Sequence, residues 1–152
     1  MSEQKREIPV LISLAALASY NGMTDDPVQM MVSGTLVPGE DVYELTYTER
    51  MEDEESGEIT ESSIRMELRK DQVTMYRAGD FSNTMLFRKN RRFETSYHTP
   101  FGDLPMAVYA REVRVERGED AGTIHLRYEV EMQGAYASTN ELHLEYWAQD
   151  QE

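Results

Sequence analysis

Residues 124–132 read Ile-His-Leu-Arg-Tyr-Glu-Val-Glu-Met, an unbroken alternation of apolar and polar side chains. Successive side chains of a β-strand point to opposite faces, so this alternation places one face on a core and the other in water. Such one-sided burial is typical of antiparallel sheets. The stretch therefore predicts a half-buried, antiparallel β-strand.

The same period of two recurs along most of the chain. It covers residues 28–36, 43–48, 64–69, 73–75, 85–88, 93–97, 104–115 and 142–146. These segments follow one another at a spacing of about 8–12 residues, which suggests a β-barrel or sandwich. No long helical pattern interrupts the series, so the sequence predicts an all-β fold.

One segment changes phase. Its apolar residues are even-numbered from Leu104 to Ala110 and odd-numbered at Val113 and Val115. An extra residue in one strand produces such a switch, so we expect a β-bulge near residues 110–112.

The first apolar segment has three interpretations. Residues 8–18 follow Lys5 and Arg6 and end in Ala-Leu-Ala, as a secretory signal does, but acidic residues flank the basic pair. A buried first strand, with Ile8, Val10, Ile12 and Leu14 on one face, fits equally, and a short helix is compatible with 14–18. We favour the strand and a cytoplasmic protein. The expected organisation is a tail over 1–7, one barrel domain over 8–147 and a tail over 148–152.

The charge balance limits the partners. The chain of 152 residues has 29 acidic and 15 basic residues, a net charge of −14, and no cysteine. Nucleic acids and anionic membranes are bound by cationic surfaces, so we expect neither as a partner. Six acids crowd residues 52–61, which we expect to be a solvated hairpin tip, and four cations crowd 88–92, which we expect to serve as counter-charges at a turn.

Residues 76–106 carry a family resemblance. They contain an Arg-x-Gly element at 77–79, a Met-x-Phe strand at 85–87 and a Thr-Pro-Phe-Gly turn at 99–102. In this order they resemble the YwiB-like family of small bacterial proteins of unknown function. The resemblance covers about residues 8–147 and implies an antiparallel lipocalin-like (calycin-type) barrel of roughly 8–10 strands. The Gly-x-Trp signature of true lipocalins is absent.

The turns of this block have a structural interpretation. Pro100 fixes φ and Gly102 supplies a conformation that a side chain would forbid, so Thr99 to Gly102 form a tight turn. We also expect a positive φ at Gly79 and expect Phe101 to fold back over one barrel end.

Arg77 is the first candidate for a binding residue. It shares its parity with Val73 and Met75, which points it into the barrel mouth, where a guanidinium needs an anionic partner. With other inward side chains it forms a predicted ligand pocket, made of Arg77, Tyr43, Tyr97, Tyr128, Met85 and Phe87. The alternative is that Arg77 reaches water at a strand end and pairs with Asp80 or another acid.

Other chemistry has weaker signals. His125 and His143 would face each other if paired positions summed to 268 and would be diagonal at 270. Two such imidazoles can bind zinc with Glu141 or Glu145 as a third ligand, but both face solvent, so the pair is more simply an ordinary cross-strand pair of polar residues. No Gly-rich phosphate loop or nucleophile motif is present, so we expect no cofactor, no metal and no catalytic residue. The leading prediction is a barrel that binds a small anionic or amphipathic molecule. The alternatives are a protein–protein interaction module with a solid core and, third, an enzyme that uses the barrel mouth; the sequence leaves the oligomeric state open.

Overall fold

The computed structural model describes residues 6–20 and 22–149, and all regular structure in this part of the chain is β. No helix in it could cross a membrane. The strands are β1 (Ile8–Tyr20), β2 (Met23–Thr24), β3 (Val28–Val37), β4 (Tyr43–Glu52), β5 (Ile59–Leu68), β6 (Gln72–Ala78), β7 (Asn83–Arg88), β8 (Arg92–Thr99), β9 (Gly102–Glu116), β10 (Ala121–Met132) and β11 (Ala135–Ala148).

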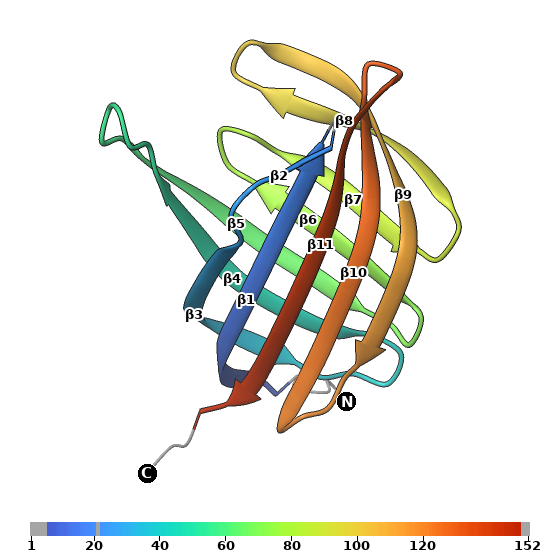
Figure 1. Cartoon of the computed structure of the whole chain (residues 1–152). Helices are drawn as coiled ribbons and strands as arrows, with labels where there is room; N and C mark the ends of the chain where they lie inside the picture. The colour runs from blue at the N-terminus through green and yellow to red at the C-terminus, as the bar shows by residue number, and fades with distance from the viewer. Residues whose placement is uncertain (1–5, 21, 150–152) are drawn as a thin grey trace.

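Ten strands form one antiparallel sheet in the order β7-β6-β5-β4-β3-β1-β11-β10-β9-β8, and β2 pairs with the end of β1. The sheet curls until its two edges approach (Figure 1). Ser82 and His98 exchange backbone hydrogen bonds of 3.0 and 2.8 Å across the seam, and Asn90 N–H donates to Ala110 O at 2.8 Å. The predicted all-β, lipocalin-like barrel is confirmed, with the seam almost closed.

The first segment is a strand. β1 lies between β3 and β11 and pairs with both, and Val10, Ile12 and Leu14 are buried. The buried-strand interpretation of this segment is therefore confirmed. Its apolar face is needed in the core, because every inward position of a closed barrel must be filled or solvated.

The predicted bulge is present in β9. Glu112 pairs with Arg127 and Ala110 with Tyr128, so Arg111 has no opposite residue in β10. The extra residue explains why the apolar positions change from even to odd along this strand. The side chain of Arg111 forms a salt bridge with Glu129.

The conformation at Gly79 and the turn over residues 99–102 agree with the predictions, whereas the position of Phe101 does not. Gly79 has φ of +149°, and a Cβ there would lie 2.9 Å from Glu61 O. Thr99 Oγ1 donates to Gly102 O at 2.7 Å and accepts from Phe101 N–H at 3.1 Å, which closes the turn. The expectation that Phe101 covers a barrel end is wrong: its side chain is 95% exposed, because this closed turn directs the ring into solvent.

The two charged loops lie where the sequence places them. The acidic segment forms the exposed turn between β4 and β5, closed by Asp53, whose N–H donates to Glu58 O and whose O accepts from Gly57 N–H. This hairpin projects from the barrel at the left of Figure 1. In the basic turn, Arg92 pairs with Glu131 and Glu94, as a counter-charge would.

The barrel has two unlike ends. The turns β4–β5, β6–β7, β8–β9 and β10–β11 share one end, which we call the loop end. At the opposite, closed end Arg117 Nη1 donates to Asp41 O at 2.6 Å and Leu68 O at 2.9 Å, and the Tyr146 hydroxyl donates to Gly118 O at 2.7 Å. These bonds fix the chain across the closed end.

Candidate functional site

Arg77 lies inside the loop end and already has an anionic partner. Its Nη1 is 2.6 Å from Glu49 Oε1, and the two side chains are only 24% and 14% exposed. Glu49 shares the inward parity of Leu45 and Tyr47 on β4. A charge withdrawn from water requires such a partner, and the fold itself supplies it.

Two phenols lie in the electrostatic field of this ion pair. Burial raises the pKa of Tyr128 to about 12, an effect that Arg77 opposes and Glu49 reinforces. Burial likewise raises the pKa of Tyr47 well above its usual value, with a further contribution from Glu49. Both hydroxyls therefore stay protonated and uncharged at neutral pH.

Asn83 completes this polar group. It stands directly opposite Arg77 in the β6–β7 ladder and is 8% exposed. Its Nδ2 contacts Met106 Sδ at 3.6 Å, while Oδ1 finds no hydrogen-bond partner within residues 6–20 and 22–149. Sequence reasoning missed Asn83 and Glu49, although the parity of each with its buried neighbours was a visible signal.

The predicted pocket residues do not converge on one site. Phe87 packs on Tyr128 with ring centroids 4.7 Å apart, and Met85 is buried nearby. Tyr97 stacks on Phe81 at 6.0 Å beside the seam, next to the Ser82–His98 pair. Tyr43 lies under Arg117 at the closed end, six residues along β4 from Glu49 and so about 20 Å away.

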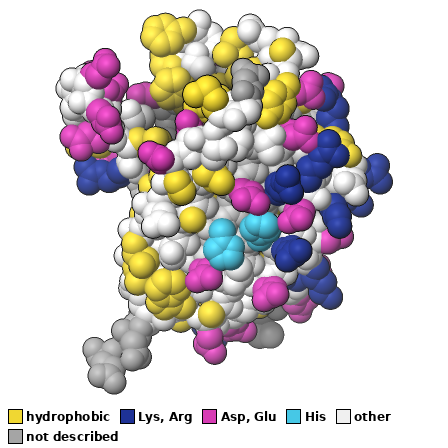
Figure 2. Space-filling view, in the orientation of Figure 1, with side chains coloured by type: hydrophobic (Ala, Val, Ile, Leu, Met, Phe, Trp, Pro, Cys, Tyr) yellow, Lys and Arg dark blue, Asp and Glu magenta, His cyan; other side chains and the backbone are white. Residues whose placement is uncertain are grey.

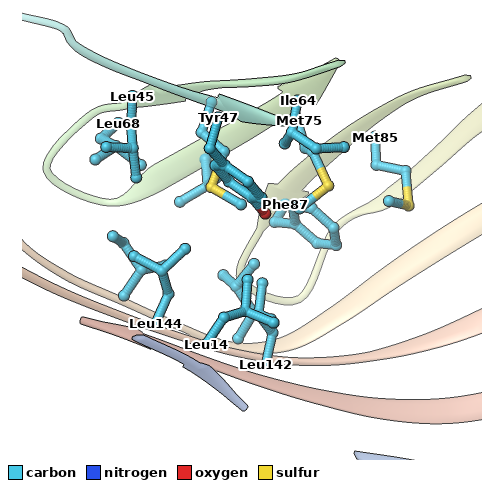
Figure 3. Packing of buried hydrophobic residues seen from close by; sticks show 14 of the residues in the cluster. Leu14, Leu45, Tyr47, Ile64, Leu68, Met75, Met85, Phe87, Leu142 and Leu144 are labelled. Carbon is cyan, nitrogen blue, oxygen red and sulfur yellow. The ribbon is translucent and has the colours of Figure 1, made fainter. Parts of the chain in front are cut away.

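Buried apolar side chains form one cluster in the interior. Leucines from β1 and β11 meet residues of β4 to β7 across the barrel (Figure 3). A small hollow of about 120 Å³ remains at the loop end, between Ala16, Ala18, Tyr128, Asn140 and Leu142. Ligand pockets typically need about 300–1,000 Å³, so this hollow is small for a drug-sized molecule.

A larger hollow lies on the outside of the wall. β3 and β4 pair only from Gly34–Tyr47 to Val37–Glu44; beyond Gly34 the strands diverge. Within the described chain, residues 28–33 of β3 and 48–52 of β4 have no strand partner on the facing edges, and we call this gap the split. A hollow of about 780 Å³ begins at the apex of the split and extends over the paired part of β3 and β4 to β5 and β6. It is lined by Ser33, Thr35, Thr46, Thr48 and Ser63 and bounded by Arg65 and Tyr76, whose cation–π contact is 4.0 Å.

The histidines form a cross-strand pair. His125 stands opposite His143, the first of the two registers that the sequence left open, with ring centroids 6.0 Å apart. Figure 2 shows two neighbouring histidines in cyan. His125 Nδ1 is 3.4 Å from Glu112 Oε2, and His143 Nε2 is 3.2 Å from Glu145 Oε1. In the described part of the chain no three His, Asp or Glu side chains come together in a group that could hold a metal ion.

Comparison with known proteins agrees with the fold. The crystal structure of ywiB protein from Bacillus subtilis matches with a TM-score of 0.79 and 15% sequence identity, covering 95% of this chain and 94% of that chain. At this identity the similarity shows the fold alone. No curated protein matches the sequence. A family model, "Domain of unknown function (DUF1934)", matches residues 12–144. These matches confirm the YwiB-like resemblance, and the chain belongs to the DUF1934 family.

Proposed function

We propose that this protein is a binding module that takes a segment of a partner protein at the split in its barrel wall. The split has two strand edges with no partner in the described chain, and the hollow of about 780 Å³ adjoins its apex. Unpaired strand edges are templates for pairing with another chain, and natural proteins usually cover them. This observation carries the proposal, and it favours an interaction module over a carrier.

The interior supports the same choice. A barrel of this size either is filled by side chains or holds one small ligand, and a large buried apolar cluster in this one supports the first arrangement. Arg77, the residue that would attract an anion, is already neutralised by Glu49. A small anionic ligand inside the barrel therefore has less support than a partner outside it.

The experiment closes the split covalently. Gly34 and Tyr47 are paired, so Ser33 and Thr48 stand at the next position, and Ser33→Cys with Thr48→Cys gives a disulfide that holds the split shut. Thr35→Cys with Thr46→Cys, at an existing ladder pair, gives a disulfide that leaves it open. The chain has no other cysteine, so each bond forms without competition.

A displayed library of random twelve-residue peptides is then selected on the unmodified protein. We expect enriched peptides that bind the open control staple and lose at least about tenfold in affinity on the closed staple. If selection yields no binder, or if every binder tolerates the closed staple, the proposal is overturned.

A small ligand at the loop end is the second candidate, favoured by the unpartnered Asn83 Oδ1 beside Arg77. Such a ligand would be a neutral molecule that donates a hydrogen bond, because the ion pair leaves no net charge to satisfy. Native mass spectrometry checks this candidate. A bound mass that Asn83→Leu removes supports it, and the absence of any bound mass in the unmodified protein contradicts it.

A further inference from the structure

We propose that the segment bound at the split is extended and cationic, with alternating Lys or Arg and apolar residues, and that it adds as a strand to the free edge of β4. The inference rests on the function proposed above and names the chemistry of the partner. It draws on three features: the geometry of the edge, the distribution of charge and the position of exposed apolar side chains.

The free edge of β4 can accept a strand. Residues 48–52 pair with β5 on one side, from Thr48–Ser63 to Glu52–Ile59, and face the split on the other. Four of these five residues are exposed. A strand added about 4.8 Å from β4 would bond to its backbone groups, and such main-chain bonds supply affinity in strand addition.

The negative charge of the protein is concentrated in the half of the chain that bears the split. Residues 7–64 contain thirteen acids and a single cation, Arg50, and so carry −12 of the total −14. Residues 65–152 contain fifteen acids and twelve cations, many of them paired with one another, as Arg92 is with Glu131 and Arg111 with Glu129. The field of the molecule therefore attracts cations chiefly to its β1–β5 half.

Acids stand on both sides of the split. Asp25 and Asp26 immediately precede β3, and Glu52, Glu54 and Glu55 lie on the projecting β4–β5 hairpin; all five are exposed. Figure 2 shows the acids of this hairpin at the left, in magenta. Cationic side chains placed between the two groups would relieve the repulsion among these acids, which a neutral or acidic segment would not do.

Exposed apolar side chains occupy the same half. Eight large hydrophobic residues are exposed in the described chain, and six of them fall between residues 20 and 59: Tyr20, Met23, Val28, Met31, Met51 and Ile59. The surface is thus acidic and apolar together. Since alternate side chains of a strand point to opposite faces, a segment with alternating cationic and apolar residues presents one kind to each face.

The test uses three labelled peptides in fluorescence anisotropy titrations. The first is Ac-Lys-Val-Lys-Thr-Lys-Val-Lys-Thr-NH2, the second replaces every Lys with Glu, and the third keeps the Lys peptide but methylates the amide nitrogens of one edge. Methylation removes backbone donors without changing charge or side chains. We expect the Lys peptide to bind and each of the other two to bind at least about tenfold more weakly.

Two charge-matched variants locate the site. One neutralises the acids around the split, as Asp26→Asn, Glu52→Gln, Glu54→Gln and Glu55→Gln. The other neutralises four exposed acids elsewhere, as Asp71→Asn, Glu116→Gln, Asp120→Asn and Glu145→Gln. Both reduce the net charge equally, and we expect only the first to weaken the Lys peptide, by at least about tenfold.

The outcomes separate this inference from the function on which it rests. If the methylated Lys peptide binds as well as its parent, or if the two charge variants weaken binding equally, attraction is diffuse and the inference is overturned. If the peptides selected in the library experiment depend on the split but are neutral or acidic, the proposed function stands and the cationic assignment fails. If no peptide depends on the split, both fail.

Discussion

Gly34 and Tyr47 are the last paired residues of β3 and β4 before the two strands diverge. A Cβ on Gly34 would lie 2.5 Å from Thr46 O and 2.7 Å from Ile12 Cδ1, so the strands approach here as only glycine allows. This close approach of β3 and β4 lies at the apex of the split. The shape of the wall at this point depends on a residue with no side chain.

Replacing Gly34 should therefore strain the apex. We expect Gly34→Val to lower the free energy of unfolding by about 1–3 kcal/mol, the usual cost of overpacking. Urea denaturation followed by circular dichroism measures this change. Ser33→Ala, at the exposed neighbouring position, is the control and should stay within about 0.5 kcal/mol. Equal stability of both variants would contradict the close approach at Gly34.

Removing one partner of the Arg77–Glu49 ion pair should destabilise the protein more than removing both. We expect Glu49→Gln to cost about 3 kcal/mol, because it leaves a largely buried guanidinium without its counter-charge. Arg77→Met combined with Glu49→Gln should recover most of that loss, since no buried charge remains. A double-mutant cycle in chemical denaturation measures the coupling, and additive effects would show that the two side chains act independently.

Stability should fall in alkaline solution. The pKa of Tyr128 is about 12 in the folded protein and near 10 when unfolded, so the unfolded state loses its proton first as pH rises. The free energy of unfolding should therefore decrease between pH 10 and 12, by about 1.4 kcal/mol per pH unit for each such phenol. Denaturation at pH 9, 10 and 11 measures the slope, and Tyr128→Phe should reduce it. An unchanged slope in that variant would contradict the burial of this hydroxyl.

Two phenylalanines of the YwiB-like block, Phe87 and Phe101, should differ sharply in their effect on stability. Phe101→Ser should leave the free energy of unfolding within about 0.5 kcal/mol of the unmodified protein, because the ring contacts solvent. Phe87→Ala should cost about 3–5 kcal/mol, because it empties a fully buried position beside Tyr128. Thermal and urea denaturation compare the two, and a large loss in Phe101→Ser would restore the idea that Phe101 covers a barrel end.

The sequence was sufficient for the wall of the barrel and insufficient for its site. Alternation and the change of phase predict the strands and the bulge near Arg111, because each depends only on which face a side chain occupies. They leave the register of His125 and His143 open, since opposite and diagonal positions share one face. Parity does not give height along the barrel. Tyr43 and Arg77 both point inward, yet they lie at opposite ends.

The sequence also does not predict contacts between strands that are not neighbours in the sheet. Glu49 on β4 meets Arg77 on β6 across the intervening β5, and no local pattern records that meeting. The split was invisible for a similar reason. The alternation of residues 28–36 continues past Gly34, and that of residues 43–48 continues past its partner Tyr47. The sequence therefore predicts two strands but not the place where their pairing ends.

Amide hydrogen exchange of β4 tests the central claim most directly. Addition of a strand would protect backbone N–H groups in residues 48–52 that face the split and have no strand partner there in the described chain. We predict that the Lys peptide slows exchange at alternate residues of 48–52 and leaves residues 44–47, which already pair with β3, unchanged. Slower exchange spread over the loop end, or none within 48–52 at saturating peptide, would contradict the account.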